Sequence, residues 1–282
     1  MVDRLAESGA IQYAKEKHND INGTSRIGGS GFIAGAYKDF MDWSSSNVGV
    51  IPNALSARGH WYLAFYKEFS SYGYNMTSAG DYFSTPDSVA NSITGNISMI
   101  VDVALTDWTP TVANCLIAKD GVSAGTRSYQ FAVRTDGKLQ IAFSTTGSNI
   151  ITAVSTVAPD FVNGQRYHVA VERESVSGKV RFYTGVNHMN MTLLGTEVTA
   201  TAGAIADTTA VVQFGNLSGL AYELSGKVFD SEIYSGLAVS DRTNAIMKVD
   251  FDPTDWVSGS TWVSEDTGET WTLNGNAKVF RT

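Results

Sequence analysis

Two glutamates on either side of Arg173, Glu172 and Glu174, are the side chains of this sequence that come nearest to a catalytic spacing. On one face of a β-strand, residues two apart are separated by about 6.6 Å. A pair of carboxylates about 6.5–9.5 Å apart can hydrolyse a glycosidic bond with inversion. The pair lies at the mouth of a turn over 175–178, where carboxylates are ordinarily solvated. We therefore expect two solvated charges here and no catalytic residue.

Other catalytic and cofactor-binding patterns lack their context. The sequence has no Gly-x-Ser-x-Gly motif between a strand and a helix, and its four histidines do not have the spacing of metal ligands. Residues 29–34 match the Gly-x-Gly-x-x-Ala dinucleotide fingerprint, but no apolar strand precedes them, so we interpret them as a hinge. The single cysteine, Cys115, excludes an intramolecular disulfide framework and is expected to be a small buried residue. The sequence predicts no enzyme and no cofactor.

The elements that must position these residues are β-strands, from about residue 80 onward. Residues 97–105 alternate large apolar side chains with smaller or polar ones, which predicts a strand with one buried face. Further strands are predicted at 113–118, 128–134, 138–144, 150–157, 166–173, 179–184, 210–215 and 227–234. Asp136-Gly137, Asn163-Gly164 and Ser177-Gly178 suit tight hairpins. The segment 250–282 is expected to complete or edge the same antiparallel β-sandwich.

The residue pattern of 1–79 differs from that of the rest of the chain. They suggest short helices and a glycine-rich break, followed by an aromatic run at 61–69. Their apolar side chains exceed what so short a segment can bury alone. We therefore predict two parts, an N-terminal attachment or oligomerisation segment over 1–79 and a sandwich over 80–282. The residues expected to attach are Ile33, Tyr37, Phe40, Met41, Trp61, Phe65 and Phe69.

Composition argues against several partners and destinations. The 282 residues include 27 glycines, which favours a turn-rich β protein, and their net charge of −8 makes a nucleic acid partner unexpected. No stretch approaches the roughly 18 apolar residues of a membrane span, so we expect no membrane. Residues 1–7 are charged and have no apolar core, so we expect no signal peptide and synthesis in a cytoplasm.

Several predicted hairpins follow one another in an order that resembles the laminin G-like, concanavalin A-like jelly rolls, over about residues 80–245. The matching stretches are 80–88 (GDYFSTPDS), 93–97 (ITGNI), 101–110 (VDVALTDWTP), 128–134 (SYQFAVR), 136–139 (DGKL), 163–173 (NGQRYHVAVER), 178–183 (GKVRFY), 224–228 (LSGKV) and 232–237 (EIYSGL). The resemblance implies a mainly β jelly-roll sandwich, here with a small, partly helical N-terminal segment. The Glu-x-Asp-x-x-Glu strand motif of laminarinase-type hydrolases is absent.

The resemblance also implies two kinds of ligand. Sandwiches of this type bind glycans through aromatic faces beside Asp or Asn, and we expect Trp108 with Asp107, Asp102 and Tyr129 to serve, the alternative being that these rings belong to the core. Many laminin G-like domains hold calcium through aspartates. Asp250, Asp252 and Asp255 are the calcium candidates, with Asp102 and Asp107 as a second set. Neither set has a diagnostic spacing, so turn-forming aspartates are the alternative and no metal is expected.

A finer likeness concerns residues 86–88, 107–110, 250–253 and 264–276, which resemble versions of this domain in tailed-phage structural proteins. It implies a non-enzymatic virion protein, a capsid decoration, neck or tail-associated subunit whose jelly roll can contact surface glycans. The implied partners are other virion proteins and further copies of the chain, and the implied location is the virion. Two alternatives stay open: a glycan-active hydrolase on the same fold, and a non-virion adhesion or scaffold module.

Overall fold

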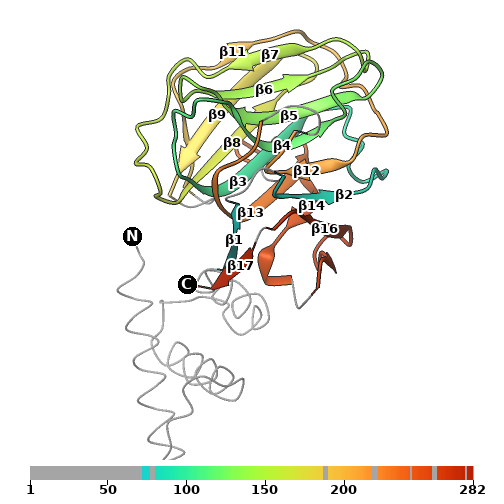
Figure 1. The fold of residues 1–282 in the computed structure, drawn as a ribbon. Coiled ribbons are helices and arrows are strands. Elements are labelled where there is room, and N and C mark those ends of the chain that lie inside the picture. Colours follow the sequence, from blue (N-terminus) through green and yellow to red (C-terminus); the bar gives the residue numbers. More distant parts are fainter. Residues whose placement is uncertain are drawn as a thin grey trace, which may run out of the picture. The chain divides into compact units, whose positions relative to one another are not determined.

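Two antiparallel β-sheets packed face to face form the described part of the chain (Figure 1). The computed structural model describes residues 72–76, 80–186, 190–217, 222–241, 243–255, 259–276 and 278–281. Within these ranges the single helical element is a 3-10 turn, η1 (Pro253–Asp255). A search of the same residues finds no helix with the length and apolar character needed to cross a membrane. The predicted fold class, a mainly β antiparallel sandwich, is confirmed.

Each sheet combines strands that are distant in the sequence. Sheet A has the order β10-β9-β8-β3-β13-β1-β17, with β11 also on β9 and β14 on β13. Its strands are β1 (Tyr72–Met76), β3 (Ile97–Leu105), β8 (Tyr167–Arg173), β9 (Lys179–Gly185), β10 (Thr192–Leu193), β11 (Val198–Thr199), β13 (Gly226–Ser235), β14 (Ile246–Phe251) and β17 (Lys278–Arg281). Sheet B has the order β15-β16-β2-β12-β4-β5-β6-β7. Its strands are β2 (Tyr82–Thr85), β4 (Asn114–Asp120), β5 (Arg127–Val133), β6 (Leu139–Phe143), β7 (Ile151–Val154), β12 (Val212–Phe214), β15 (Thr261–Val263) and β16 (Thr270–Asn274).

The central strand β3 has the predicted alternation but not the predicted exposure. Its odd-numbered residues, from Ile97 to Leu105, fill the core between the sheets. Its even-numbered residues face outward and are nevertheless buried. For Ser98 and Ile100 the cause is the β13–β14 connection, whose Ala238 donates its N–H to Ser98 and packs with Ile100 on the outer face of sheet A. Asp102 is instead covered by Arg166 and His168. The expectation of a single buried face was therefore wrong for this strand.

The predicted hairpin glycines adopt the backbone conformation that their turns require. Gly137 and Gly178 have φ angles of 76° and 72°, which side chains with a Cβ rarely adopt. At Gly178 a Cβ would also lie 2.3 Å from the carbonyl oxygen of Ala200. These turns set the register of the β5–β6 and β8–β9 pairs.

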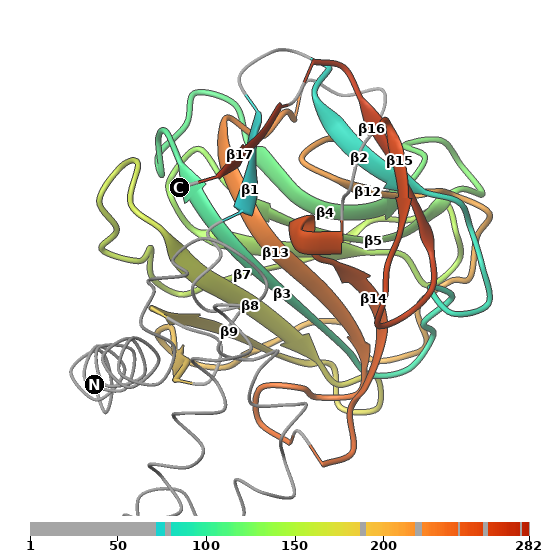
Figure 2. The same cartoon turned by 90° about the horizontal axis from the view of Figure 1, so that it is seen from below.

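The C-terminal strands complete the sandwich, as the sequence predicted. Tyr74 of sheet A packs on Phe83 of sheet B with ring centroids 4.3 Å apart, and on Trp262 of β15 at 5.7 Å. Phe251 of β14 lies 4.7 Å from Phe83. Figure 2 shows β14, η1 and the β15–β16 pair beside β13 and β2. Aromatic rings from both sheets therefore close this end of the core.

The first described strand lies upstream of residue 80. β1 pairs with β13 and β17 in sheet A, and residues 71–282 form one compact unit. The sandwich therefore includes part of the chain that the sequence had assigned to the N-terminal segment. Residues 1–71 lie outside the described residues, and with them the partly helical character and the seven predicted attachment residues.

Candidate functional site

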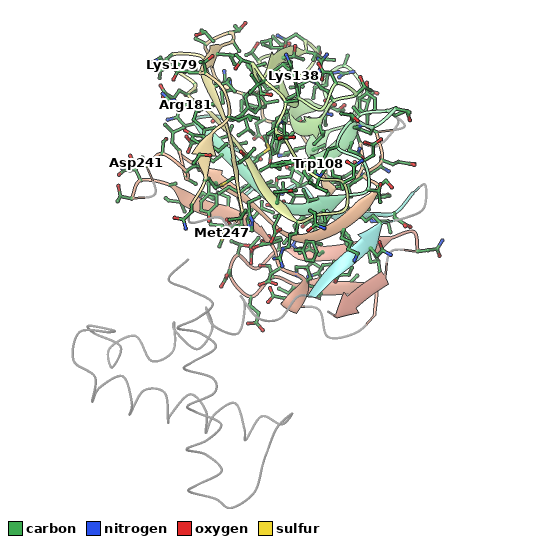
Figure 3. All side chains as sticks on the ribbon, turned by 90° about the vertical axis from the view of Figure 1, so that its left-hand side faces the viewer. Trp108, Lys138, Lys179, Arg181, Asp241 and Met247 are labelled. Carbon is green, nitrogen blue, oxygen red and sulfur yellow. The ribbon has the colours of Figure 1, made fainter. Side chains whose placement is uncertain are left out.

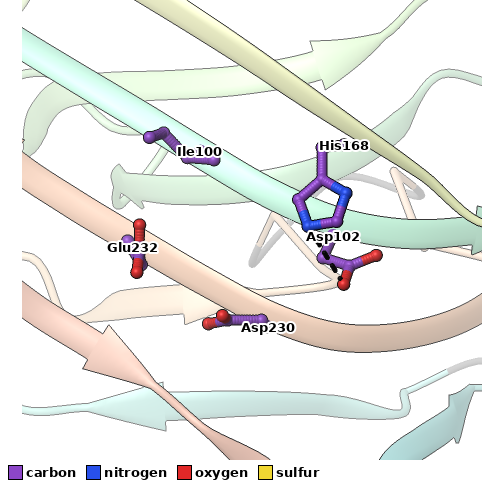
Figure 4. A pocket seen from close by; sticks show the side chains of 5 residues that line it. All are labelled: Ile100, Asp102, His168, Asp230 and Glu232. Carbon is purple, nitrogen blue, oxygen red and sulfur yellow. Dashed lines mark ion pairs between the residues drawn. The ribbon is translucent and has the colours of Figure 1, made fainter. Parts of the chain in front are cut away.

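The outer face of sheet A carries a group of polar side chains on three neighbouring strands. Cross-strand pairing places Asp102 of β3 between Asp230 of β13 and His168 of β8. In the adjacent row Glu232 of β13 lies opposite Ile100 of β3. These five residues line one small hollow with room for about a single water molecule (Figure 4). A hollow of this size can contact part of a ligand without enclosing it.

A β-bulge in β13 brings Asp230 into this group. The pairing of β13 with β3 shifts between Val228 and Asp230, so that Phe229 is an extra residue. Val228 faces the core, and regular alternation would have turned Asp230 toward the core as well. The bulge reverses that direction and places the carboxylate beside Asp102.

Asp102 is the fixed anion of the hollow. The Nε of Arg166 donates to its two carboxylate oxygens at 2.8 and 2.9 Å, and Nη2 of Arg166 also donates to Oδ2. The Nε2 atom of His168 lies 3.3 Å from Oδ2 of Asp102. The guanidinium of Arg166 also covers the ring of Phe229, 4.1 Å from its centroid. The bulge residue thus supports the arginine that holds Asp102 in place.

A second acidic group adjoins the hollow. One carboxylate oxygen each from Asp230, Glu232 and Asp250 of β14 lies within 4.8 Å of the others. The hydroxyl of Tyr234 donates to Oε2 of Glu232 at 3.0 Å. Burial and the neighbouring carboxylates of Glu232 and Asp250 raise the pKa of Asp230 well above its usual value of about 3.8. The trio could accept hydrogen bonds from ligand hydroxyls, and its hard oxygens are of the type that binds calcium.

Replacing Asp230 with asparagine is expected to stabilise the protein at neutral pH. A carboxyl whose folded-state pKa is raised favours the folded state at low pH, and this contribution is lost as pH rises from about 4 through the raised value. The melting temperature of Asp230→Asn should therefore exceed that of the wild type at pH 7, by about 2–4 °C for each kcal/mol of stability recovered. Near pH 3.5 the two should converge.

The matched control for this prediction is Asp160→Asn, which changes an exposed aspartate in a loop. It should leave the melting temperature within about 1 °C at both pH values. Equal melting temperatures for wild type and Asp230→Asn across pH 4–8 would contradict the electrostatic account.

The two glutamates that first suggested catalysis have structural roles. Glu172 is 1% exposed and accepts hydrogen bonds from the backbone N–H groups of Val239 and Ser240, at 2.6 and 3.0 Å. It also accepts from the hydroxyls of Ser240 and Tyr183, at 2.7 and 2.9 Å. Glu174 instead pairs with Arg181 at 2.7 Å. The prediction of two solvated charges was therefore wrong for Glu172, whose carboxylate anchors the β13–β14 connection.

The four predicted glycan-binding residues do not form one site. Trp108, labelled in Figure 3, is 3% exposed and packs edge-on against Phe161. Tyr129 is fully buried and its hydroxyl donates to the carbonyl of Asn91. A sugar cannot reach either ring face, so both belong to the core. Asp107 caps its own turn by accepting from the N–H of Thr109, and Asp102 alone lies in the hollow.

The calcium candidates are also separated. Asp250 joins Asp230 and Glu232, a set that the sequence did not predict because strand pairing creates it. Asp255 accepts from the N–H of Glu265 at 2.9 Å, and Asp252 lies at the start of η1. The second predicted set is divided too, because Asp102 faces the hollow and Asp107 faces its turn. Cys115 is fully buried, as predicted, and burial raises the pKa of its thiol.

Known proteins resemble this chain in fold and not in sequence. No family model matches the sequence, and no curated protein matches it. A solved structure of a Bacteroides ovatus protein to which carbohydrate binding is ascribed aligns with a TM-score of 0.54 at 10% identity. The alignment covers 75% of this chain and 60% of that one, so the chain spans less than two thirds of that protein.

Two further solved structures are similar at lower scores. The heptameric SAP-like pentraxin of Limulus polyphemus has a TM-score of 0.48 at 10% identity, over 75% of this chain and 95% of that one. Domains LG4-5 of the mouse laminin α1 chain have a TM-score of 0.42 at 12% identity, over 65% and 44%. The likeness to the Bacteroides ovatus structure agrees with the antiparallel β-sandwich that the sequence predicted.

Proposed function

We propose that the sandwich is a non-enzymatic carbohydrate-binding domain and that the hollow on sheet A contacts the glycan. The observation that carries this proposal is the convergence of three carboxylates and an imidazole from three adjacent strands around one small hollow on the outer face of sheet A. Sugar hydroxyls both donate and accept hydrogen bonds, and carboxylates with fixed positions suit pairs of adjacent hydroxyls. The fold shared with the Bacteroides ovatus protein, to which carbohydrate binding is ascribed, supports the same class of ligand.

The non-enzymatic part of the proposal rests on where the carboxylates lie. Glu172 is occupied by the β13–β14 connection, and Glu174 by Arg181. In the hollow Asp102 is held by Arg166.

A glycan array probed with the full chain tests the site. We expect binding to at least one glycan, and Glu232→Gln should weaken it about tenfold, because one hydrogen bond to a charged group contributes about 1.5–3 kcal/mol. The matched control is Glu265→Gln, which makes the same chemical change at an exposed turn of sheet B and should leave the affinity unchanged.

Three outcomes would count against the proposal. An array without any bound glycan would refute carbohydrate binding, and equal affinity in wild type and Glu232→Gln would move the site away from the hollow. Hydrolysis of the bound glycan by wild type, lost in Asp230→Asn or Glu232→Gln, would favour the hydrolase alternative instead.

We further infer that the domain is displayed on a phage virion, with the residues that precede β1 attaching it to capsid, neck or tail proteins. The support is the likeness of residues 86–88, 107–110, 250–253 and 264–276 to tailed-phage structural proteins, together with the apolar side chains of 1–79. Immunodetection of the chain in particles purified from a lysate tests this part. A chain that stays entirely outside the particles would refute it.

A further inference from the structure

The last strand of sheet B, β7, has one side without a partner strand. Within the described ranges β7 pairs only with β6 (Figure 1). The N–H of Ser155 donates to the carbonyl of Leu139, which fixes the phase of this ladder. The N–H and C=O groups of Ile151 and Ala153 therefore point to β6, and those of residues 150, 152 and 154 point to the other side. This side offers a regular row of donors and acceptors to a further strand.

The other sheet edges among the described residues have features that oppose the addition of a strand. In sheet A, β10 and β11 are two residues long, and β17 begins and ends with a basic residue. The backbone N–H of Asp250 in β14 already donates to the side chains of Thr267 and Glu269. In sheet B, β15 is three residues long and is followed closely by Glu265 and Asp266.

The edge formed by β7 has none of these protections. From residue 139 to residue 159 the sequence contains no charged side chain, and its single proline there, Pro159, lies beyond the strand. The sequence of residues 150–154 is IITAV, which favours an extended strand. Ile150 is 55% exposed, and Thr152 is exposed as well. The edge is therefore open to pairing with an uncharged strand.

A second copy of this chain matches the edge in charge and in hydrogen bonding. The net charge of −8 opposes contact between copies in general, whereas the uncharged stretch around β7 adds nothing to that repulsion. Two identical antiparallel strands related by a two-fold axis also present the same groups to each other. With Thr152 opposite Thr152 of the second copy, Ile150 lies opposite Val154, and all three outward residues are bonded. Ile–Val and Thr–Thr are favourable cross-strand pairs.

We propose that β7 pairs antiparallel with β7 of a second copy about a two-fold axis at Thr152, so that sheet B continues from one molecule into the other. Each of the three residue pairs exchanges two backbone hydrogen bonds, about six in all. A contact between two strands of four residues is small, and interfaces below about 1,200 Å² are typical of weak, reversible association. The contact uses no residue of the hollow and does not depend on the proposed function.

Disulfide trapping of the full chain tests the register. The Cα atoms of a hydrogen-bonded antiparallel pair are about 5.5 Å apart, which a disulfide can span. Thr152→Cys should therefore give a covalent dimer under mild oxidation, detected on a non-reducing gel. The native Cys115 is buried and should not compete. The matched control is Thr261→Cys, which alters an exposed threonine at the opposite edge of sheet B and should give little dimer.

Two further variants should break the contact and keep the fold. Thr152→Pro removes an N–H that points away from β6, and Ile150→Lys places a charge in the apolar contact. Sedimentation equilibrium of the full chain should show a mean mass that rises up to twofold over about a hundredfold range of concentration, and neither variant should show this rise. Val263→Lys is the matched control, because Val263 is also 55% exposed and lies on β15, and it should associate like the wild type. Thermal melts establish that each variant is folded.

The results can overturn the proposal in three ways. Thr152→Cys could give no more covalent dimer than Thr261→Cys. Association of the wild type could persist unchanged in Thr152→Pro and Ile150→Lys, which would assign it to another surface. A wild-type mass that is constant over the whole concentration range would leave the edge to an extended segment of a different protein. Trapping by Thr152→Cys together with loss of association in both edge variants is the expected result.

Discussion

Glu172→Ala is expected to lower the free energy of unfolding by about 3–4 kcal/mol, because it leaves several buried donors without an acceptor. The carboxylate accepts from two backbone N–H groups in the β13–β14 connection and from the hydroxyls of Ser240 and Tyr183. No water can reach these groups easily, since Glu172 is almost fully buried. Urea denaturation followed by tryptophan fluorescence measures the change.

Glu174→Ala is the matched control, two residues along the chain. Its ion pair with Arg181 is partly exposed, and such pairs contribute only about 0–1 kcal/mol. Limited proteolysis adds a local measurement, because the connection over 236–245 should be cleaved faster in Glu172→Ala and not in Glu174→Ala. Similar losses of stability in the two variants would contradict the anchoring role of Glu172.

Local sequence signals predicted the strands because both periodicity and turn chemistry act over a few residues. The strand predicted over 97–105 has the same bounds in the structure, and Gly137 and Gly178 have the positive φ that their hairpins required. The burial of the outward-facing residues of this strand could not be predicted from such local signals. It depends on a connection about 140 residues downstream, which folds back over Ile100 and Ala170.

The candidate site depended on features that no local pattern contains. The bulge at Phe229 turns Asp230 outward, and pairing between β13 and β14 brings Asp250 to Glu232. The alternation of Asp230, Glu232 and Tyr234 was the one available signal for an acidic strand face. Without the strand order it could not be joined to Asp102 and His168, which come from other parts of the chain.

The acidic side chains on the outer face of sheet A have an electrostatic consequence. Asp102, Asp230, Glu232 and Asp250 gather on sheet A, where burial of like charges raises the pKa of Asp230. A bound cation would relieve this repulsion, so added salt should weaken the binding of a cation at the hollow.

Trp108→Ala is expected to cost about 3–5 kcal/mol, the range for removing a large aromatic side chain from a core. Its ring lies 4.6 Å from that of Phe161, which stacks on Tyr167 at 3.8 Å. The loss would leave a cavity under both rings. At about 2–4 °C per kcal/mol, differential scanning calorimetry should record a melting temperature lower by roughly 6–20 °C.

Trp108→Phe separates packing from sugar recognition. The indole N–H of Trp108 has no hydrogen-bond acceptor among the described residues, so a phenyl ring gives up volume but no hydrogen bond. We expect this variant to lose about a third of the stability lost by Trp108→Ala and to bind glycans with the affinity of the wild type. A Trp108→Ala protein that melts like the wild type but no longer binds glycans would contradict the core assignment. It would restore Trp108 as the stacking residue that the sequence predicted, because only a ring that leaves the core in solution could then contact the sugar.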